Sequence, residues 1–128
     1  TNPSQDPRIS IRGVGARWTE ETADIELPRI ASATRVRLVL RVAAPRPAGR
    51  PPAATTVSID GRVVGLAANL SPDFRDVALA LDPVAVRRIQ AGPTKLTLRT
   101  PPFVPAEAGG TDTRRLGVMV DWLRLEVQ

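Results

Sequence analysis

The sequence predicts an all-β fold, a two-sheet antiparallel β-sandwich of the jelly-roll type with one short helix. Apolar and polar residues alternate in short runs along the chain, which is the period of a strand with one buried face. Thirteen prolines and nine glycines separate these runs as turn formers. Strands and helices show no regular alternation, so a doubly wound parallel sheet is not expected.

The N-terminal third contributes a flexible lead-in and three strands. Residues 1–7 are polar and are expected to precede a single domain over 8–128. Alternation predicts strands over 8–14, where glycines follow, and over 24–27, where Pro28 follows. Residues 34–43 give the clearest strand, with one apolar face and, on the other face, three arginines and a valine, namely Arg35, Arg37, Arg41 and Val39.

The middle of the chain predicts a hairpin over residues 55–66. Asp60-Gly61 stands between two alternating runs, and a tight hairpin turn requires positive φ angles that this pair adopts readily. The proline-rich segment 44–53 before the hairpin is expected to be an exposed, stiff loop. Residues 67–72 are expected to form a linker, and residues 74–81 to form the next strand.

A short helix and two strands complete the predicted fold. Asp82 is a suitable N-cap, Pro83 suits the first helical position, and Gly92 ends the helix predicted over 82–91. Strands are expected over 94–100 and 117–127, with the long loop 100–115 between them. A loop of that length in a compact domain often carries function.

Composition excludes several functional classes. The chain has no cysteine or histidine, so Ser/His/Asp and Cys/His catalysis are excluded and a zinc enzyme is not expected. The carboxylate pairs Glu20/Glu21 and Asp73/Asp76 have no spacing that favours glycoside hydrolysis, and we expect no enzyme activity. We expect no cofactor, and structural calcium has only weak support because no dense acidic loop exists.

The net charge of +5 raises the question of nucleic-acid binding. We do not expect it, because the arginines are spread along the chain and aromatic residues form only 3% of it. The arginine face of the strand over 34–43 allows two interpretations, a solvated sheet face or a contact surface for anionic groups. The sequence contains no apolar run long enough to span a membrane.

Asp121 interrupts the apolar C-terminal strand. By strict alternation it lies on the inward face with Leu123 and Leu125, unless a β-bulge resets the register. A buried carboxylate needs a charged or multi-donor partner, and Arg115 or Arg75 is the preferred one, with Arg46 as a third option. Three interpretations stay open: a structural ion pair that fastens the 100–116 loop, a ligand-binding acid, or an exposed residue at a bulge.

The order of these segments resembles the galactose-binding-like β-sandwich modules of bacterial membrane proteins related to glycosyltransferases and mannosyltransferases. The segments that carry the resemblance are RPAGRPP (46–52), VSIDGRVV (57–64), PDFRDVAL (72–79), RTPPFVP (99–105) and DTRRLGVMVDWLRLE (112–126). The resemblance implies a galactose-binding-like fold, an extracytoplasmic location, a carbohydrate or glycolipid ligand, and a neighbouring domain of a larger membrane protein.

The predicted function is therefore that of a non-catalytic accessory module that binds carbohydrate. The alternative is a structural domain that packs on a neighbouring domain or on copies of itself. Trp18 and Phe103 could stack on a sugar ring, or they could cap the ends of the core. The candidate ligand-binding residues are Trp18, Arg46, Arg75, Phe103, Asp112, Arg115 and Asp121.

Overall fold

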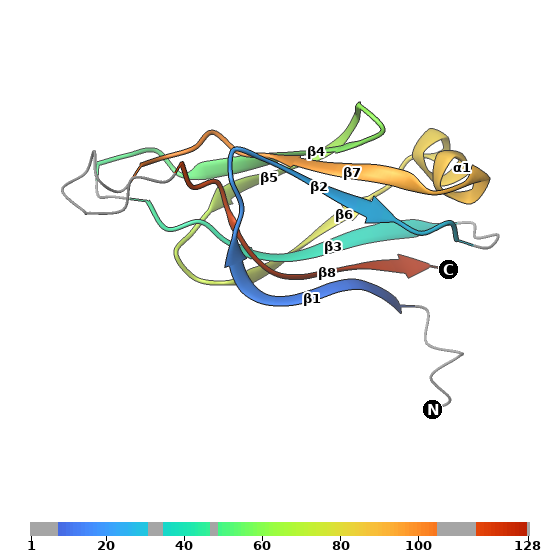
Figure 1. Ribbon diagram of the computed structural model, residues 1–128, viewed down its shortest axis with the longest axis horizontal. Coiled ribbons are helices and arrows are strands. Elements are labelled where there is room, and N and C mark those ends of the chain that lie inside the picture. Colours follow the sequence, from blue (N-terminus) through green and yellow to red (C-terminus); the bar gives the residue numbers. More distant parts are fainter. Residues whose placement is uncertain (1–7, 31–34, 47–48, 105–114, 128) are drawn as a thin grey trace.

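The computed structural model describes residues 8–30, 35–46, 49–104 and 115–127, and for residues 8–18 it describes the backbone alone. Within these ranges lie eight strands and one helix (Figure 1). Their bounds are β1 Arg8–Trp18, β2 Thr22–Leu27, β3 Val36–Ala43, β4 Ala53–Ile59, β5 Arg62–Leu70, β6 Arg75–Ala80, α1 Pro83–Ala91, β7 Thr94–Arg99 and β8 Met119–Val127. The predicted lead-in over 1–7 lies outside the described residues.

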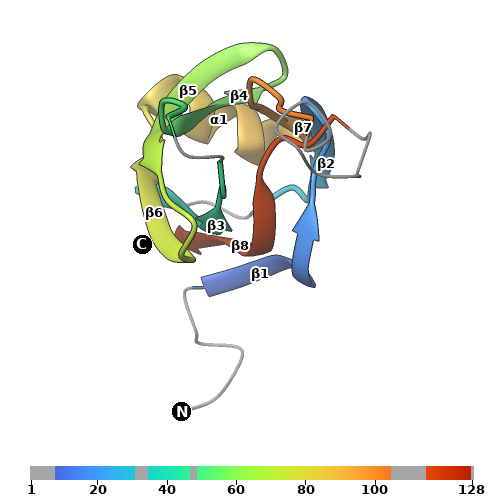
Figure 2. The ribbon, with the colours of Figure 1, turned by 90° about the vertical axis from the view of Figure 1, so that its left-hand side faces the viewer.

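The strands form two four-stranded antiparallel sheets that face each other. One sheet has the order β1-β8-β3-β6 and the other has the order β2-β7-β4-β5. Successive strands thus alternate between sheets except at the β4–β5 hairpin, which is the strand order of a jelly roll. Figure 2, which views the molecule along the strands, shows the two layers and the helix beyond them. The predicted fold class is confirmed.

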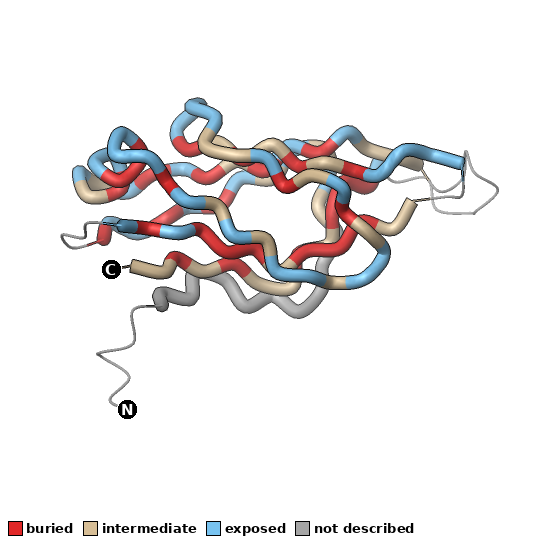
Figure 3. The backbone as a smooth tube through the Cα atoms, turned by 180° about the vertical axis from the view of Figure 1, so that it is seen from behind, coloured by how far each residue is buried: buried red, intermediate tan, exposed pale blue. Residues whose placement is uncertain are grey.

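Alternation along the strands builds the core. In β4 every second residue is buried, from Ala53 to Ile59. β7 in the same sheet and β8 in the facing sheet contribute fully buried leucines to the core between the sheets. Figure 3 shows buried and exposed positions alternating along the chain. Val39 departs from this pattern, since it belongs to the arginine face of β3 and yet is only 4% exposed. No membrane-spanning helix occurs among the described residues.

The helix forms as its sequence predicts. The side chain of Asp82 accepts a hydrogen bond of 2.8 Å from the backbone N–H of Ala85, which satisfies one of the free N–H groups of the first turn. Pro83 is the first helical residue and Gly92 follows the last. The buried residues of the helix, Ala85, Val86 and Ile89, close one end of the sandwich.

Two strands are longer than expected. β1 continues past Gly13 and Gly15 as far as Trp18, because register shifts let it stay paired with β8. The predicted linker over 67–72 is wrong at its start, since β5 continues to Leu70. Ala67 and Leu70 are buried opposite β4, and a bulge with Asn69 at a φ of 54° lets the strand turn inward there.

Candidate functional site

The end of the sandwich opposite α1 gathers the loops that the sequence predicted to hold the site. Arg46 lies at its centre. Its guanidinium donates hydrogen bonds to the backbone oxygens of Pro45 (3.0 Å), Pro101 (3.2 Å) and Gly117 (2.7 Å). It also lies over the ring of Phe103, 4.4 Å from the ring centroid. Arg46 therefore joins the proline-rich segment to Pro101 and Gly117, which lie after β7 and before β8.

Backbone contacts also hold the segment around Gly117 in place. Phe103 and Leu116 pair as an isolated antiparallel bridge. Thr19 makes three hydrogen bonds to Gly117 and Val118, which directly precede β8. They involve its N–H, its carbonyl group and its hydroxyl, which accepts from the N–H of Val118 at 3.1 Å. Gly117 lies so close to this corner that an added Cβ would stand 2.3 Å from the backbone oxygen of Glu20. A residue larger than glycine does not fit there without movement.

Beside this framework an open pocket of about 420 Å³ is lined by Glu20, Glu21, Thr22 and Arg115. The Arg115 guanidinium donates to the Glu21 carboxylate at 2.8 Å, and both side chains are exposed to solvent, at 65% and 40%. An ion pair this exposed contributes little to stability, about 0–1 kcal/mol. Its donors and acceptors are thus available to a ligand at small energetic cost.

Arg46 differs from Arg115, the arginine that lines the pocket, in its burial and its electrostatic surroundings. Burial, followed by the charge of Arg50, lowers the pKa of Arg46 from its ordinary value. The side chain nevertheless keeps its charge, because an arginine pKa lies so far above neutrality. Three carbonyl oxygens and an aromatic ring surround it, and these are the partners of a structural cation. Among the predicted site residues, Arg46 and Phe103 thus fasten the neighbouring loops, and Arg115 is the one that lines the pocket.

The prediction that Asp121 points inward is wrong. A bulge falls on β8 at this residue, since Arg41 of β3 pairs with Trp122 and Val42 pairs with Val120, which leaves Asp121 without a paired residue on β3. Val120 and Leu123 are buried on either side of the bulge, and the Asp121 side chain is 35% exposed. Its partner is Arg41, with 3.3 Å between Oδ2 and Nε, instead of Arg115 or Arg75.

The other predicted site residues do not all join the pocket. Arg75 donates at 2.5 Å to the backbone oxygen of Ala68. Trp18 ends β1 opposite Met119, so its backbone adjoins the loop end, and its side chain lies outside the described residues. Asp112 also lies outside them.

Sequence reasoning missed Glu21 as a binding candidate. It was considered only as half of a catalytic carboxylate pair with Glu20. The signal that could have singled it out is the complementary charge of Arg115, but the contact joins residues 94 positions apart.

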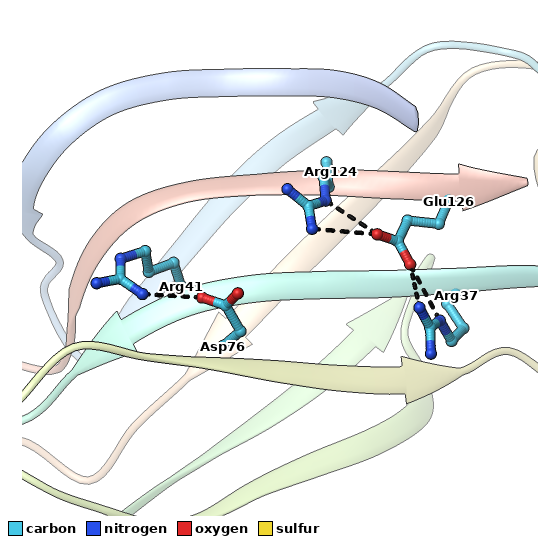
Figure 4. A network of polar contacts seen from close by, with 5 residues as sticks. All are labelled: Arg37, Arg41, Asp76, Arg124 and Glu126. Carbon is cyan, nitrogen blue, oxygen red and sulfur yellow. Dashed lines mark hydrogen bonds and ion pairs between the residues drawn. The ribbon is translucent and has the colours of Figure 1, made fainter. Parts of the chain in front are cut away.

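The outer face of the sheet that contains β3 carries an ion-pair network in place of a bare arginine face (Figure 4). Arg37 and Arg124 both bond the Glu126 carboxylate, and Arg41 bonds Asp76 at 3.0 Å. Strand pairing places these residues on neighbouring strands, so each arginine of β3 meets acids of β6 or β8.

The described residues contain no group of three or more acidic, histidine or cysteine side chains placed to hold a metal ion. The Asp60 carboxylate is held by residues outside its own turn, on β7 and α1. One carboxylate oxygen accepts from the Lys95 N–H and the other from Arg88, each at 2.8 Å. The hydrogen bond from Lys95, followed by that from Arg88, lowers the pKa of Asp60.

No protein-family model matches this chain, and no curated protein is similar to it. Among solved structures it is similar to the CBM36-1 domain of a multidomain xylanase from the hindgut metagenome of Trinervitermes trinervoides. The TM-score is 0.46 at 9% identity, over 92% of this chain and 94% of that one. It is also similar to a family 35 carbohydrate binding module from Clostridium thermocellum, with a TM-score of 0.45 at 16% identity, over 95% of this chain and 89% of that one.

Proposed function

We propose that the domain is a non-catalytic module that binds carbohydrate in the loop-end pocket, which is lined by Glu20, Glu21, Thr22 and Arg115. One observation carries the proposal: the exposed Glu21–Arg115 pair presents acceptors and donors side by side in the lining of the pocket. Sugar hydroxyls are both donors and acceptors, and a shallow preformed pocket with a few fixed polar groups suits them.

The absence of catalysis is part of the same proposal. The chain lacks histidine and cysteine. Two acids considered as catalytic candidates are held by arginines, Glu21 by Arg115 and Asp76 by Arg41. These contacts occupy carboxylate oxygens that general acid–base catalysis would need.

The motif resemblance supports finer expectations, which we include in the proposal. They are a galactose-binding-like module, an extracytoplasmic location, and a place beside a bacterial membrane glycosyltransferase-like or mannosyltransferase-like protein. The support for them is the set of five segments from residue 46 to residue 126.

A glycan array on the whole domain, followed by calorimetric titration of the strongest neutral hits, tests the binding site. Glu21→Gln and Arg115→Gln should each weaken binding about tenfold, the effect of losing one hydrogen bond to a charged group. Glu26→Gln is the matched control, since Glu26 is an exposed acid near the far end of β2, the strand that begins directly after Glu21. No binding by any glycan, or equal affinity in all three variants, contradicts the proposal.

Self-association is the second candidate function, and β5 favours it. Val63 and Leu66 on this strand are 61% and 54% exposed, and β5 is an edge strand of its sheet. Two copies could pair their β5 strands across a two-fold axis and cover these side chains. Sedimentation equilibrium distinguishes the cases: a dimer that Leu66→Thr dissociates supports this candidate, and a monomer at all concentrations removes it.

A further inference from the structure

The helix end of the sandwich holds a pocket of about 600 Å³ that the proposed carbohydrate site does not use. It lies between the start of β3, the end of β6 and the first turn of α1. Its apolar lining includes Val36, Leu81 and Val86, which are 2%, 8% and 6% exposed and therefore belong to the core, and the exposed residues Ala80 and Pro83. The base of the pocket is thus fixed by the packing of the sandwich.

Charged side chains line the same pocket. They are Arg35, Arg37 and Glu126. Arg37 bonds one oxygen of Glu126 through Nε and Nη2, and Arg124 bonds the other oxygen at 3.1 Å (Figure 4). Arg35 is exposed, and the described contacts include no carboxylate partner for it. The pocket is therefore lined by two guanidinium groups and one carboxylate, which Arg124 also bonds, and this leaves an excess of positive charge at the pocket.

Arg37 retains donors after it has bonded Glu126. A guanidinium has five N–H groups, and the contact with Glu126 occupies two of them. Residues 35 and 37 are two positions apart in extended chain, a spacing of about 7 Å. Both side chains border the pocket, so one anion could accept hydrogen bonds from both.

We propose that this pocket binds a small anionic ligand whose carboxylate or phosphate group is attached to a ring with an apolar face. The anion meets Arg35 and Arg37, and the ring lies against Val36, Leu81 and Val86. A pocket with an apolar base, a few convergent polar groups and this volume has the character of a small-molecule site. The loop-end pocket is a separate site, so either proposal can fail without the other.

Backbone amide shifts of the whole domain in solution test the proposal, with four probes at low salt: D-glucuronate, glucose 1-phosphate, inorganic phosphate and neutral D-glucose. We expect the two anionic sugars to shift the amides of 35–37, 80–86 and 126. Their affinity should fall as salt rises, because screening weakens the attraction between charges. Glucose 1-phosphate should bind more tightly than inorganic phosphate, because the ring adds apolar contact.

Arg35→Gln should weaken the binding of both anionic sugars about tenfold, the effect of losing a charged hydrogen bond. Arg87→Gln is the matched control, since Arg87 is an exposed arginine on α1 that does not line this pocket. Three results would overturn the proposal: no shifts with either anionic sugar, equal shifts with D-glucose, or equal weakening by both substitutions. Inorganic phosphate binding as tightly as glucose 1-phosphate would overturn the role given to the apolar base.

Discussion

The two ends of the sandwich use arginine in opposite ways. At the loop end Arg46 is half-buried, and its donors bond three backbone oxygens while its flat face covers Phe103. At the helix end Arg35 is exposed, and Arg37 keeps three N–H groups beyond its contact with Glu126. The contrast shows that the groups an arginine contacts, more than the residue type, determine whether it holds loops together or can bind a ligand.

Two glycines show a second difference between the two ends of the sandwich. Gly117 at the loop end has no space for a side chain, whereas Gly92 at the helix end has open space around the position of a Cβ. The loop end is thus closely packed around backbone, and the helix end leaves room. We therefore expect substitution of Gly117 or Arg46, which pack against backbone at the first end, to cost more stability than substitution of Gly92 or Arg35 at the second.

Gly117→Ala should have the largest effect on stability. The new Cβ would stand 2.3 Å from the Glu20 backbone oxygen and 2.7 Å from the Thr19 hydroxyl, so backbone must move. We expect a loss of about 3 kcal/mol in the free energy of unfolding, at the upper end for overpacking, measured by urea denaturation. Gly92→Ala is the control and should change little. Equal stability of the two variants would show that the loop end is not closely packed.

Arg46→Met should have a smaller but clear effect. The variant leaves the backbone oxygens of Pro45, Pro101 and Gly117 without this donor, and we expect a loss of about 2 kcal/mol. Arg35→Met at the other end should stay within about 0.5 kcal/mol, because it removes no buried contact. Urea denaturation of both variants compares the two ends directly. A similar loss in each would contradict the structural role of Arg46.

Local sequence signals were sufficient for most of the fold. Alternation located the strands, Asp60-Gly61 located the hairpin, and Asp82-Pro83 located the helix. These signals are reliable because each depends on backbone geometry within a few residues. The two-sheet architecture followed because short antiparallel strands with one apolar face must bury that face against another layer.

The site was predicted only in part, because its contacts are distant in sequence. Arg46 and Phe103 were singled out and do meet, but the partner of Arg115 was not foreseen. The ends of strands also escaped prediction. β5 continues to Leu70 through a bulge at which Asn69 has a positive φ, and no alternation marks that position.

Asp121 gives the smallest expected effect and the sharpest test of the register. If the bulge places its carboxylate outside the core, Asp121→Asn removes one half-exposed contact with Arg41, and the expected loss is about 0.5 kcal/mol. An inward carboxylate held by a buried arginine would instead give a loss of about 3–5 kcal/mol when that pair is broken. Urea denaturation separates these values. A loss of the larger size would mean that strict alternation holds along β8 and that the Asp121 carboxylate lies in the core, contrary to the structure.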